Sequence, residues 1–117
     1  MTKDPVETNG DHYRVIFENE SVRVLAYSDA PGDKTTPHEH PNSVMYTLGP
    51  FKRRLTSGDQ QRDVEMPAGV AVWLAAQEHS GENIGSTNTE VVFVELKDGS
   101  LGGRTAGALG PTSSGGV

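Results

Sequence analysis

Apolar and polar residues alternate over short segments through most of this chain. In residues 21–28 (SVRVLAYS), small aliphatic side chains alternate with larger ones: Val22, Val24 and Ala26 stand between Arg23, Leu25 and Tyr27. A period of two is typical of a β-strand, because successive side chains of a strand point to opposite faces. Similar β-rich runs predict strands over residues 13–18, 21–28, 43–48, 51–56, 62–66, 70–74 and 89–97, with a further short segment over 79–85.

Turn residues separate the predicted strands. The clearest turn sequences are APGD at 30–33, SGD at 57–59 and PAG at 67–69, because Gly, Pro and Asp favour turn conformations. About seven or eight short strands, spaced roughly eight to twelve residues apart and without a sustained helical period, favour an all-β sandwich or barrel.

Both ends of the chain lack this alternation. Residues 1–12 are polar and aperiodic, and we expect them to form a flexible lead-in. Residues 98–117 hold seven of the 14 glycines. We expect this Gly/Ser-rich tail to be disordered, since it has too little apolar surface to offset the entropy lost on ordering. A single domain over residues 13–97 remains.

Composition narrows the class of protein. The 117 residues carry a net charge of −6 and include no cysteine, which excludes disulfides, thiolate nucleophiles and Cys-ligated metals. The acidic balance argues against a nucleic-acid partner. The longest apolar run, residues 70–76, is far shorter than the ~20 residues that span a bilayer, and the N-terminal residues lack the apolar stretch of a secretory signal. We therefore expect a cytoplasmic protein without a membrane partner.

Histidines provide the strongest chemical signal. His38 and His40 lie two positions apart, so on an extended segment both imidazoles point to the same face. Imidazole is the commonest metal ligand in proteins. Such a pair also occurs by chance on protein surfaces, and the assignment therefore depends on the third histidine, His79.

Two patterns in the chain resemble the two sequence motifs of the cupin superfamily. Residues 32–40 have the pattern G-x5-H-x-H, and residues 67–83 contain P-x-G followed by H-x3-N. The resemblance covers residues 20–96 and implies a double-stranded β-helix (jelly-roll) barrel with a metal ion inside it. It also implies a homodimer formed through edge strands, which need cover. The ligands that it implies are His38, His40 and His79.

The chain departs from the cupin pattern at one ligand. The family usually has a glutamate four or five residues beyond the second histidine, where this chain has Val44 and Met45. Met45 has the parity that faces the cavity. A three-histidine site without a carboxylate resembles the centre of some cupin dioxygenases that use ferrous iron. We therefore expect one divalent metal per chain, with iron favoured over zinc, nickel or manganese.

Three residues are candidates for a substrate pocket: Met45, Trp73 and Arg53. Trp73 belongs either to the barrel core or to a pocket wall. Arg53 either lies at the barrel edge or reaches into the cavity, where its planar guanidinium would suit a carboxylate. Gln77 and Glu78 are either exposed loop residues or approach the metal. Tyr27 is expected on the outer face.

These observations support two classes of function. The first is a metalloenzyme acting on a small organic acid, with oxygenase chemistry slightly ahead of redox-neutral isomerisation, cyclisation or elimination. The second is a non-catalytic small-molecule binding domain that uses the same cavity. Fold resemblance does not decide between them.

Overall fold

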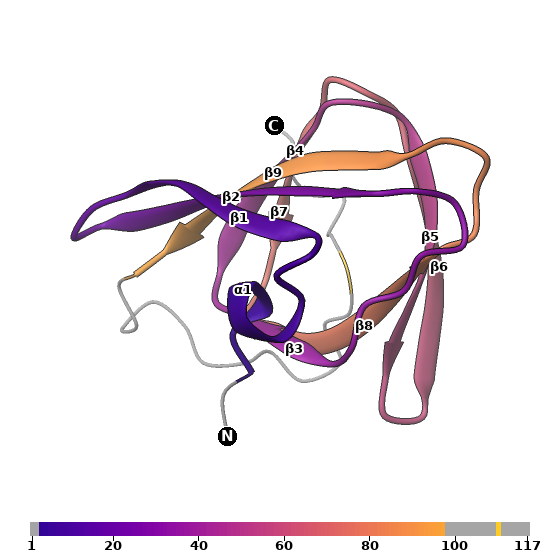
Figure 1. Cartoon of the computed structure of the whole chain (residues 1–117), viewed down its shortest axis with the longest axis horizontal. Coiled ribbons are helices and arrows are strands. Elements are labelled where there is room, and N and C mark those ends of the chain that lie inside the picture. The colour runs from indigo at the N-terminus through magenta and orange to yellow at the C-terminus, as the bar shows by residue number, and fades with distance from the viewer. Residues whose placement is uncertain (1–2, 98–109, 111–117) are drawn as a thin grey trace.

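The computed structural model describes residues 3–97 and Gly110, and in this part of the chain nine strands form two antiparallel sheets (Figure 1). The five-stranded sheet has the order β1-β2-β9-β4-β7: Tyr13–Glu18, Val22–Asp29, Thr89–Leu96, Ser43–Thr47 and Ala71–Leu74. The four-stranded sheet has the order β3-β8-β5-β6: His38–His40, Gln77–Asn83, Phe51–Ser57 and Gln60–Met66.

The alternation of side chains determines which face of each strand enters the barrel. In β9, every second residue from Thr89 onward is buried, and the residues between them are exposed or half-buried. Leu25 of β2 pairs with Phe93 of β9, and Phe93 also pairs with Met45 of β4. These inward side chains form one hydrophobic core, whose burial provides the main favourable free energy of folding.

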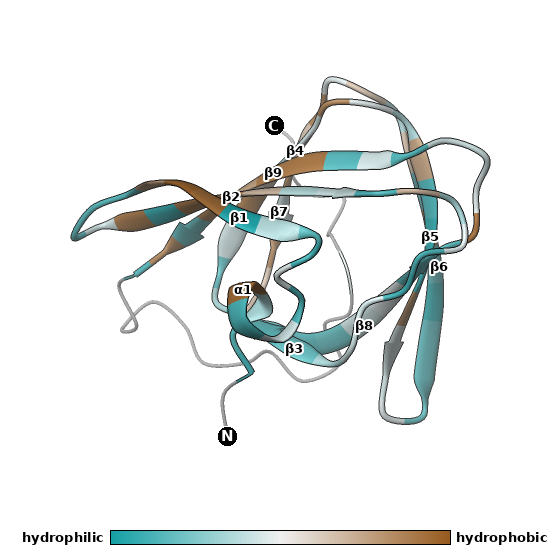
Figure 2. Ribbon diagram, in the orientation of Figure 1, coloured by the Kyte–Doolittle hydropathy of each residue, from teal (hydrophilic) through white to brown (hydrophobic). Residues whose placement is uncertain are grey.

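The two sheets differ in polarity. Hydrophobic colour is concentrated on β9 and on the β1–β2 hairpin, whereas β3 and β8 are mostly hydrophilic (Figure 2). Strand β8 has the sequence QEHSGEN, and every second residue from Gln77 is buried. The barrel therefore has an apolar side and a side whose inward residues are polar.

The β5–β6 hairpin shows how local sequence determines register. Ser57 pairs with Gln60, which leaves Gly58 and Asp59 as the two turn residues. Gly58 has a φ of 57°, a left-handed conformation that glycine adopts without steric cost. The turn sequence at 57–59 was predicted from this chemistry.

Most strand predictions are confirmed, with shifts of one or two residues at several ends. Strand β1 has the predicted bounds, and β6 begins two residues earlier than expected. The segment expected over 79–85 is strand β8, Gln77–Asn83. The prediction omitted β3, because its sequence HEH is polar and its pairing with β8 is not visible in local alternation.

The predicted flexible lead-in, residues 1–12, contains a helix in its described part. Helix α1 covers Pro5–Thr8, and the Asp4 side chain caps it by accepting a hydrogen bond from the Val6 N–H at 2.9 Å. Lys3 O accepts from the backbone N–H of Glu39 at 2.7 Å, which ties this segment to β3. The sequence did not predict this helix, because four residues are too few to produce a helical period.

Two further expectations concern the rest of the chain. The predicted disorder of the tail, residues 98–117, lies outside the described residues except for Gly110. None of the described helices has the length and apolar character needed to cross a membrane.

Candidate metal centre

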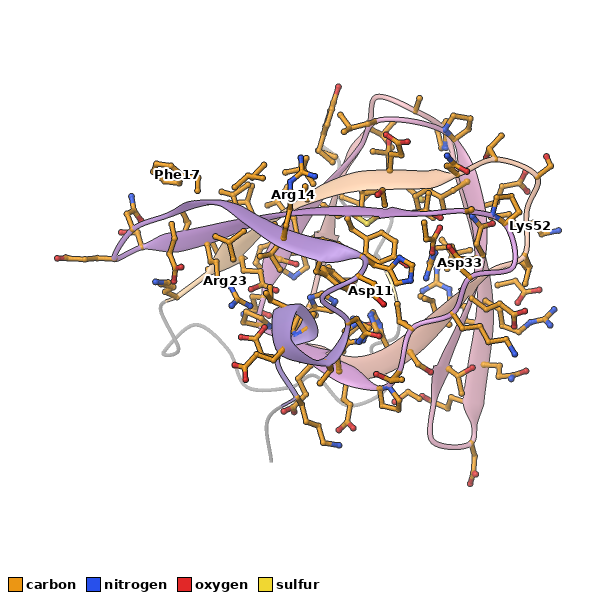
Figure 3. All side chains as sticks on the ribbon, in the orientation of Figure 1. Asp11, Arg14, Phe17, Arg23, Asp33 and Lys52 are labelled. Carbon is orange, nitrogen blue, oxygen red and sulfur yellow. The ribbon has the colours of Figure 1, made fainter. Side chains whose placement is uncertain are left out.

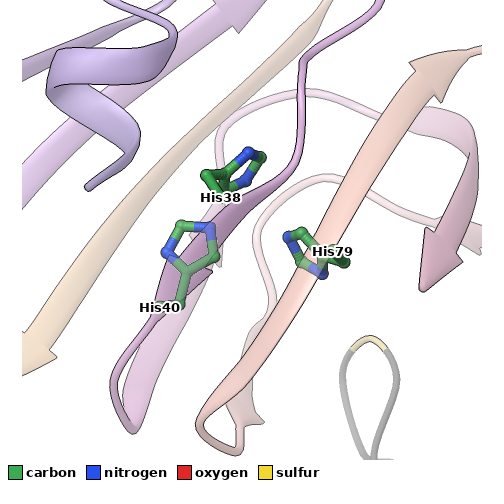
Figure 4. A group of neighbouring side chains, drawn as sticks. All are labelled: His38, His40 and His79. Carbon is green, nitrogen blue, oxygen red and sulfur yellow. The ribbon is translucent and has the colours of Figure 1, made fainter. Parts of the chain in front are cut away.

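Three buried histidines come together inside the barrel. His38 and His40 lie on β3, and His79 lies on β8, where it pairs directly with His38. Their exposed fractions are 1%, 2% and 8%, and one ligand atom from each lies within 4.8 Å of the others. Figure 4 shows the three rings turned toward a common centre. The cross-strand pairing thus joins the two sequence motifs in one cluster.

One nitrogen of each ring already has an acceptor. The Nδ1 atoms lie 2.7 Å from Thr36 O for His38, 3.0 Å from Glu95 Oε2 for His40 and 2.8 Å from Gln77 Oε1 for His79. Carbonyl and carboxylate oxygens only accept hydrogen bonds, so each Nδ1 carries hydrogen, and the Nε2 of a neutral ring then keeps its lone pair. Such outer contacts are typical of metal-binding histidines, because they fix the tautomer and the ring orientation.

The protonation states of His38 and His79 are also those that a metal ion requires. Burial, followed by the neighbouring His40, lowers the pKa of His38 to about 4. Burial, followed by His40 and His38, lowers the pKa of His79 well below its ordinary value. Both rings are therefore neutral at pH 7, and neutral imidazole is the form that binds metal. The donor set fits one divalent cation held by three nitrogens.

Glu95 connects the cluster to the N-terminal segment. Its carboxylate also accepts from Arg23, with Nε at 3.1 Å and Nη2 at 3.0 Å from Oε1. Arg23 in turn donates to both carboxylate oxygens of Asp4, at 2.8 and 3.1 Å. The Asp4 hydrogen bond, opposed by burial and assisted by Glu95, raises the pKa of Arg23. His40 is thus oriented by Glu95, which is itself held by Arg23 (Figure 3) and, through Arg23, by Asp4.

Asn9, just after helix α1, orders the loop beside His38. Its exposed fraction is 7%, its Oδ1 accepts from Thr36 N at 2.8 Å, and its Nδ2 lies 3.2 Å from Thr36 O. Asn9 Nδ2 is also 3.3 Å from His38 Nδ1. The carbonyl of Thr36 is nearer to that nitrogen and assigns its hydrogen. The N-terminal segment therefore supports the position of His38.

A largely apolar cavity of about 50 Å³ adjoins the histidines. Most of its lining consists of aliphatic and aromatic side chains. The polar or charged lining residues are Tyr13, Tyr27, Thr35, His38, Arg53, His79 and Thr89. A cavity with apolar walls and a few convergent polar groups is the usual form of a small-molecule site.

Arg53 lies inside this cavity, not at the barrel edge. Its Nη1 donates to Asp29 Oδ2 at 2.5 Å and to Thr89 Oγ1 at 3.0 Å, and its Cζ lies 5.1 Å from the centre of the Tyr27 ring. Burial opposes the charge, but Tyr27 and Asp29 together raise the pKa of Arg53. The other edge, Nε and Nη2, lies over Gly81, where an added Cβ would be 2.6 Å from Nη2.

The other two pocket predictions have different outcomes. Met45 faces the cavity, as its parity predicted, and its exposed fraction is 6%. Trp73 is not among the lining residues: it pairs with Val44, whereas its neighbour Val72 pairs with the inward Met45. Trp73 therefore lies on the opposite face of β7, and neither the pocket-wall nor the barrel-core placement is found.

Sequence reasoning missed several residues of the site. Tyr27, expected on the outer face, is buried and lines the cavity. Gln77, for which the sequence left an exposed and a metal-side placement open, is buried and accepts a hydrogen bond from His79. Glu95 gave a usable signal, because it is a carboxylate at an inward position of an otherwise apolar strand. Nothing in the local sequence marks Asn9.

Comparisons with known proteins identify the fold. A cupin domain from Bordetella pertussis Tohama I superposes with a TM-score of 0.67 at 24% identity, covering 73% of this chain and 91% of that one. A cupin-family protein with a double-stranded β-helix fold from Methanocaldococcus jannaschii has a TM-score of 0.59 at 17% identity, covering 72% and 77%. This chain has the cupin fold. The fold that its motifs imply is confirmed.

Sequence comparisons say nothing about the function of this chain. No protein-family model matches the chain, and no curated protein matches it. The structural matches also include a polyketide cyclase from Streptomyces resistomycificus, with a TM-score of 0.56 at 19% identity, covering 72% of this chain and 63% of the cyclase. At these identities the matches show the fold, and function has to be argued from the site.

Proposed function

We propose that this cupin is a mononuclear metal enzyme acting on a small organic acid, with one divalent cation held by His38, His40 and His79. The supporting observation is that every Nδ1 has an acceptor, so the three Nε2 atoms are available to a cation, and that His38 and His79 also line the apolar cavity. Iron(II) is the favoured cation, and zinc, nickel and manganese are alternatives, because imidazole suits several of these ions.

The metal and the chain have separate tasks in this proposal. When bound, the cation supplies Lewis-acid stabilisation of negative charge, and iron(II) also supplies chemistry with dioxygen. Thr36, Glu95 and Gln77 hold the imidazoles in place. Apolar side chains such as Leu74 and Phe93 limit the water beside the cluster, which strengthens electrostatic interactions there.

Arg53 is the proposed anchor for a carboxylate. Asp29 and Thr89 occupy Nη1, and no hydrogen bond from Nε or Nη2 to a described residue is found. That free edge presents two parallel donors, the arrangement that binds a carboxylate. His79 and Gly81 lie on the same face of β8, about 7 Å apart for two residues of a strand. A short acid could therefore reach from Arg53 to the histidines.

Two other functions remain as proposals of lower rank. A redox-neutral isomerase, cyclase or lyase would use the same residues, and one structural match is a polyketide cyclase. A non-catalytic binding protein would use the cavity alone. In all three cases we propose a small-molecule partner and a cytoplasmic location, not a membrane or nucleic-acid partner, in keeping with the net charge of −6.

A substrate screen distinguishes these functions. Protein loaded with iron(II) without oxygen would be mixed with small aliphatic and aromatic carboxylic acids, and conversion followed by NMR with and without dioxygen. Zinc-loaded protein and the His38→Ala/His79→Ala variant provide the comparisons. Conversion that consumes dioxygen supports the oxygenase, and conversion without it supports the redox-neutral enzyme. Binding without conversion by either metal form contradicts the enzyme proposal.

A further inference from the structure

Tyr13 places a hydroxyl group directly against the histidine cluster. It is the first residue of β1, its exposed fraction is 5%, and its side chain lines the cavity. Its hydroxyl oxygen lies 3.2 Å from His38 Nε2 and 3.3 Å from His40 Nε2. The ring is held by Tyr27 at 4.6 Å and Phe93 at 5.9 Å between centroids.

The hydrogen bonds of Tyr13 depend on whether a cation is present. Without one, the hydroxyl hydrogen has two acceptors, because both Nε2 atoms keep their lone pairs. A cation held by the histidines takes these same lone pairs. A buried hydroxyl without an acceptor is unfavourable, and the described residues offer no other hydrogen bond to the Tyr13 hydroxyl. The Tyr13 hydroxyl can then donate its hydrogen bond to another ligand of the cation.

We propose that the Tyr13 hydroxyl donates a hydrogen bond to an anionic ligand bound at the open position of the metal. Tyr13 would thus select and orient the ligand without being a metal ligand itself. The inference rests on the proposed metal centre, but not on any particular reaction.

Cobalt(II) and azide provide a test that needs no turnover. Cobalt(II) binding and then azide binding would be followed by visible absorption for the wild type, Tyr13→Phe and Tyr46→Phe. Tyr46 is 45% exposed, so the same change there is a matched control. Tyr13→Phe should bind cobalt(II) within about threefold of the wild type. It should bind azide about 10–100-fold more weakly, as expected for a lost hydrogen bond to a charged acceptor.

The possible failures are distinguishable. Equal azide affinity of Tyr13→Phe and the wild type would overturn the role of Tyr13 alone. A loss of cobalt(II) affinity as large as that of His38→Ala would also overturn it, because Tyr13 would then be a direct ligand. Failure of the wild type to bind cobalt(II) would overturn the metal centre and this inference together.

Discussion

Each candidate ligand depends on the acceptor that holds its Nδ1 hydrogen, and the three acceptors differ in chemistry. His38 has a backbone carbonyl, His79 an amide oxygen and His40 the carboxylate of Glu95. A carboxylate partner increases the basicity of an imidazole and strengthens its bond to a metal. The side chain of Glu95 is only 3% exposed, so little water competes for this contact.

Replacing Glu95 should therefore weaken metal binding. Glu95→Gln keeps the size of the side chain but removes its charge, and we expect metal affinity to fall about 10–100-fold. The measurement is a competition titration with a coloured chelator. Glu90→Gln, at an exposed position of the same strand, is the control and should bind like the wild type. Equal affinities of all three proteins would show that Glu95 does not tune the centre.

The lowered pKa of His38 predicts how metal-free protein responds to acid. The unfolded chain takes up a proton near pH 6.5, whereas folded His38 does so near pH 4. Between these values the unfolded state binds more protons, so stability falls as the pH is lowered. For His38 the loss approaches about 3 kcal/mol at pH 4. His79 shifts in the same direction.

Urea unfolding with a chelator present, at pH 7 and at pH 4.5, measures this effect. His38→Gln should lose less stability than the wild type over the same interval, since glutamine does not titrate. An equal loss in both proteins would mean that His38 is not buried as a neutral ring.

At the scale of elements, β8 contributes most to the site. Its inward residues alternate along one face: Gln77 orients a ligand, His79 is a ligand, and Gly81 makes room for Arg53. The next inward residue, Asn83, donates to Asp29 at 3.0 Å. This hydrogen bond holds the carboxylate that pairs with Arg53. One polar strand thus connects the metal end of the cavity to the anion end.

Gly81→Ala tests whether β8 positions the free edge of Arg53, and it leaves Asn83, the donor to Asp29, unchanged. The added Cβ would lie 2.6 Å from Arg53 Nη2, so the free edge of the guanidinium must move. We expect the free energy of unfolding to fall by about 1–3 kcal/mol. The affinity for a carboxylic acid that binds the wild type should fall about tenfold in calorimetric titration.

Gly49→Ala is the matched control, because no atom lies within 4 Å of its added Cβ. It should leave both quantities close to those of the wild type. Unchanged acid binding in Gly81→Ala would exclude the free edge of Arg53 as the anion anchor.

The elements also show how far the sequence could predict the protein. Strands with one apolar face, such as β2 and β9, followed from alternation, and His38, His40 and His79 followed from motif spacing. Strand β3 did not, because only its pairing with β8 makes it a strand. The position of Trp73 depends on the register of β7, and short apolar runs such as residues 70–76 do not fix which face is inward.

At the scale of the molecule, the site lies where three parts of the chain meet. The polar strands β3 and β8 supply the ligands, the apolar sheet supplies Glu95 and Tyr13, and the N-terminal segment supplies Asn9. These parts are distant in sequence, which is why local patterns identified the ligands but not the groups that orient them. The fold brings them together through long-range strand pairing.

The central claim is that this assembly holds one divalent metal, and metal analysis tests it most directly. Wild type purified without added metal would be compared with His38→Ala/His79→Ala and with His12→Ala. His12 contacts Ser28 O outside the cluster and serves as the control. We predict close to one equivalent of metal in the wild type and in His12→Ala, and almost none in the double variant. Equal metal content in all three proteins would contradict the account.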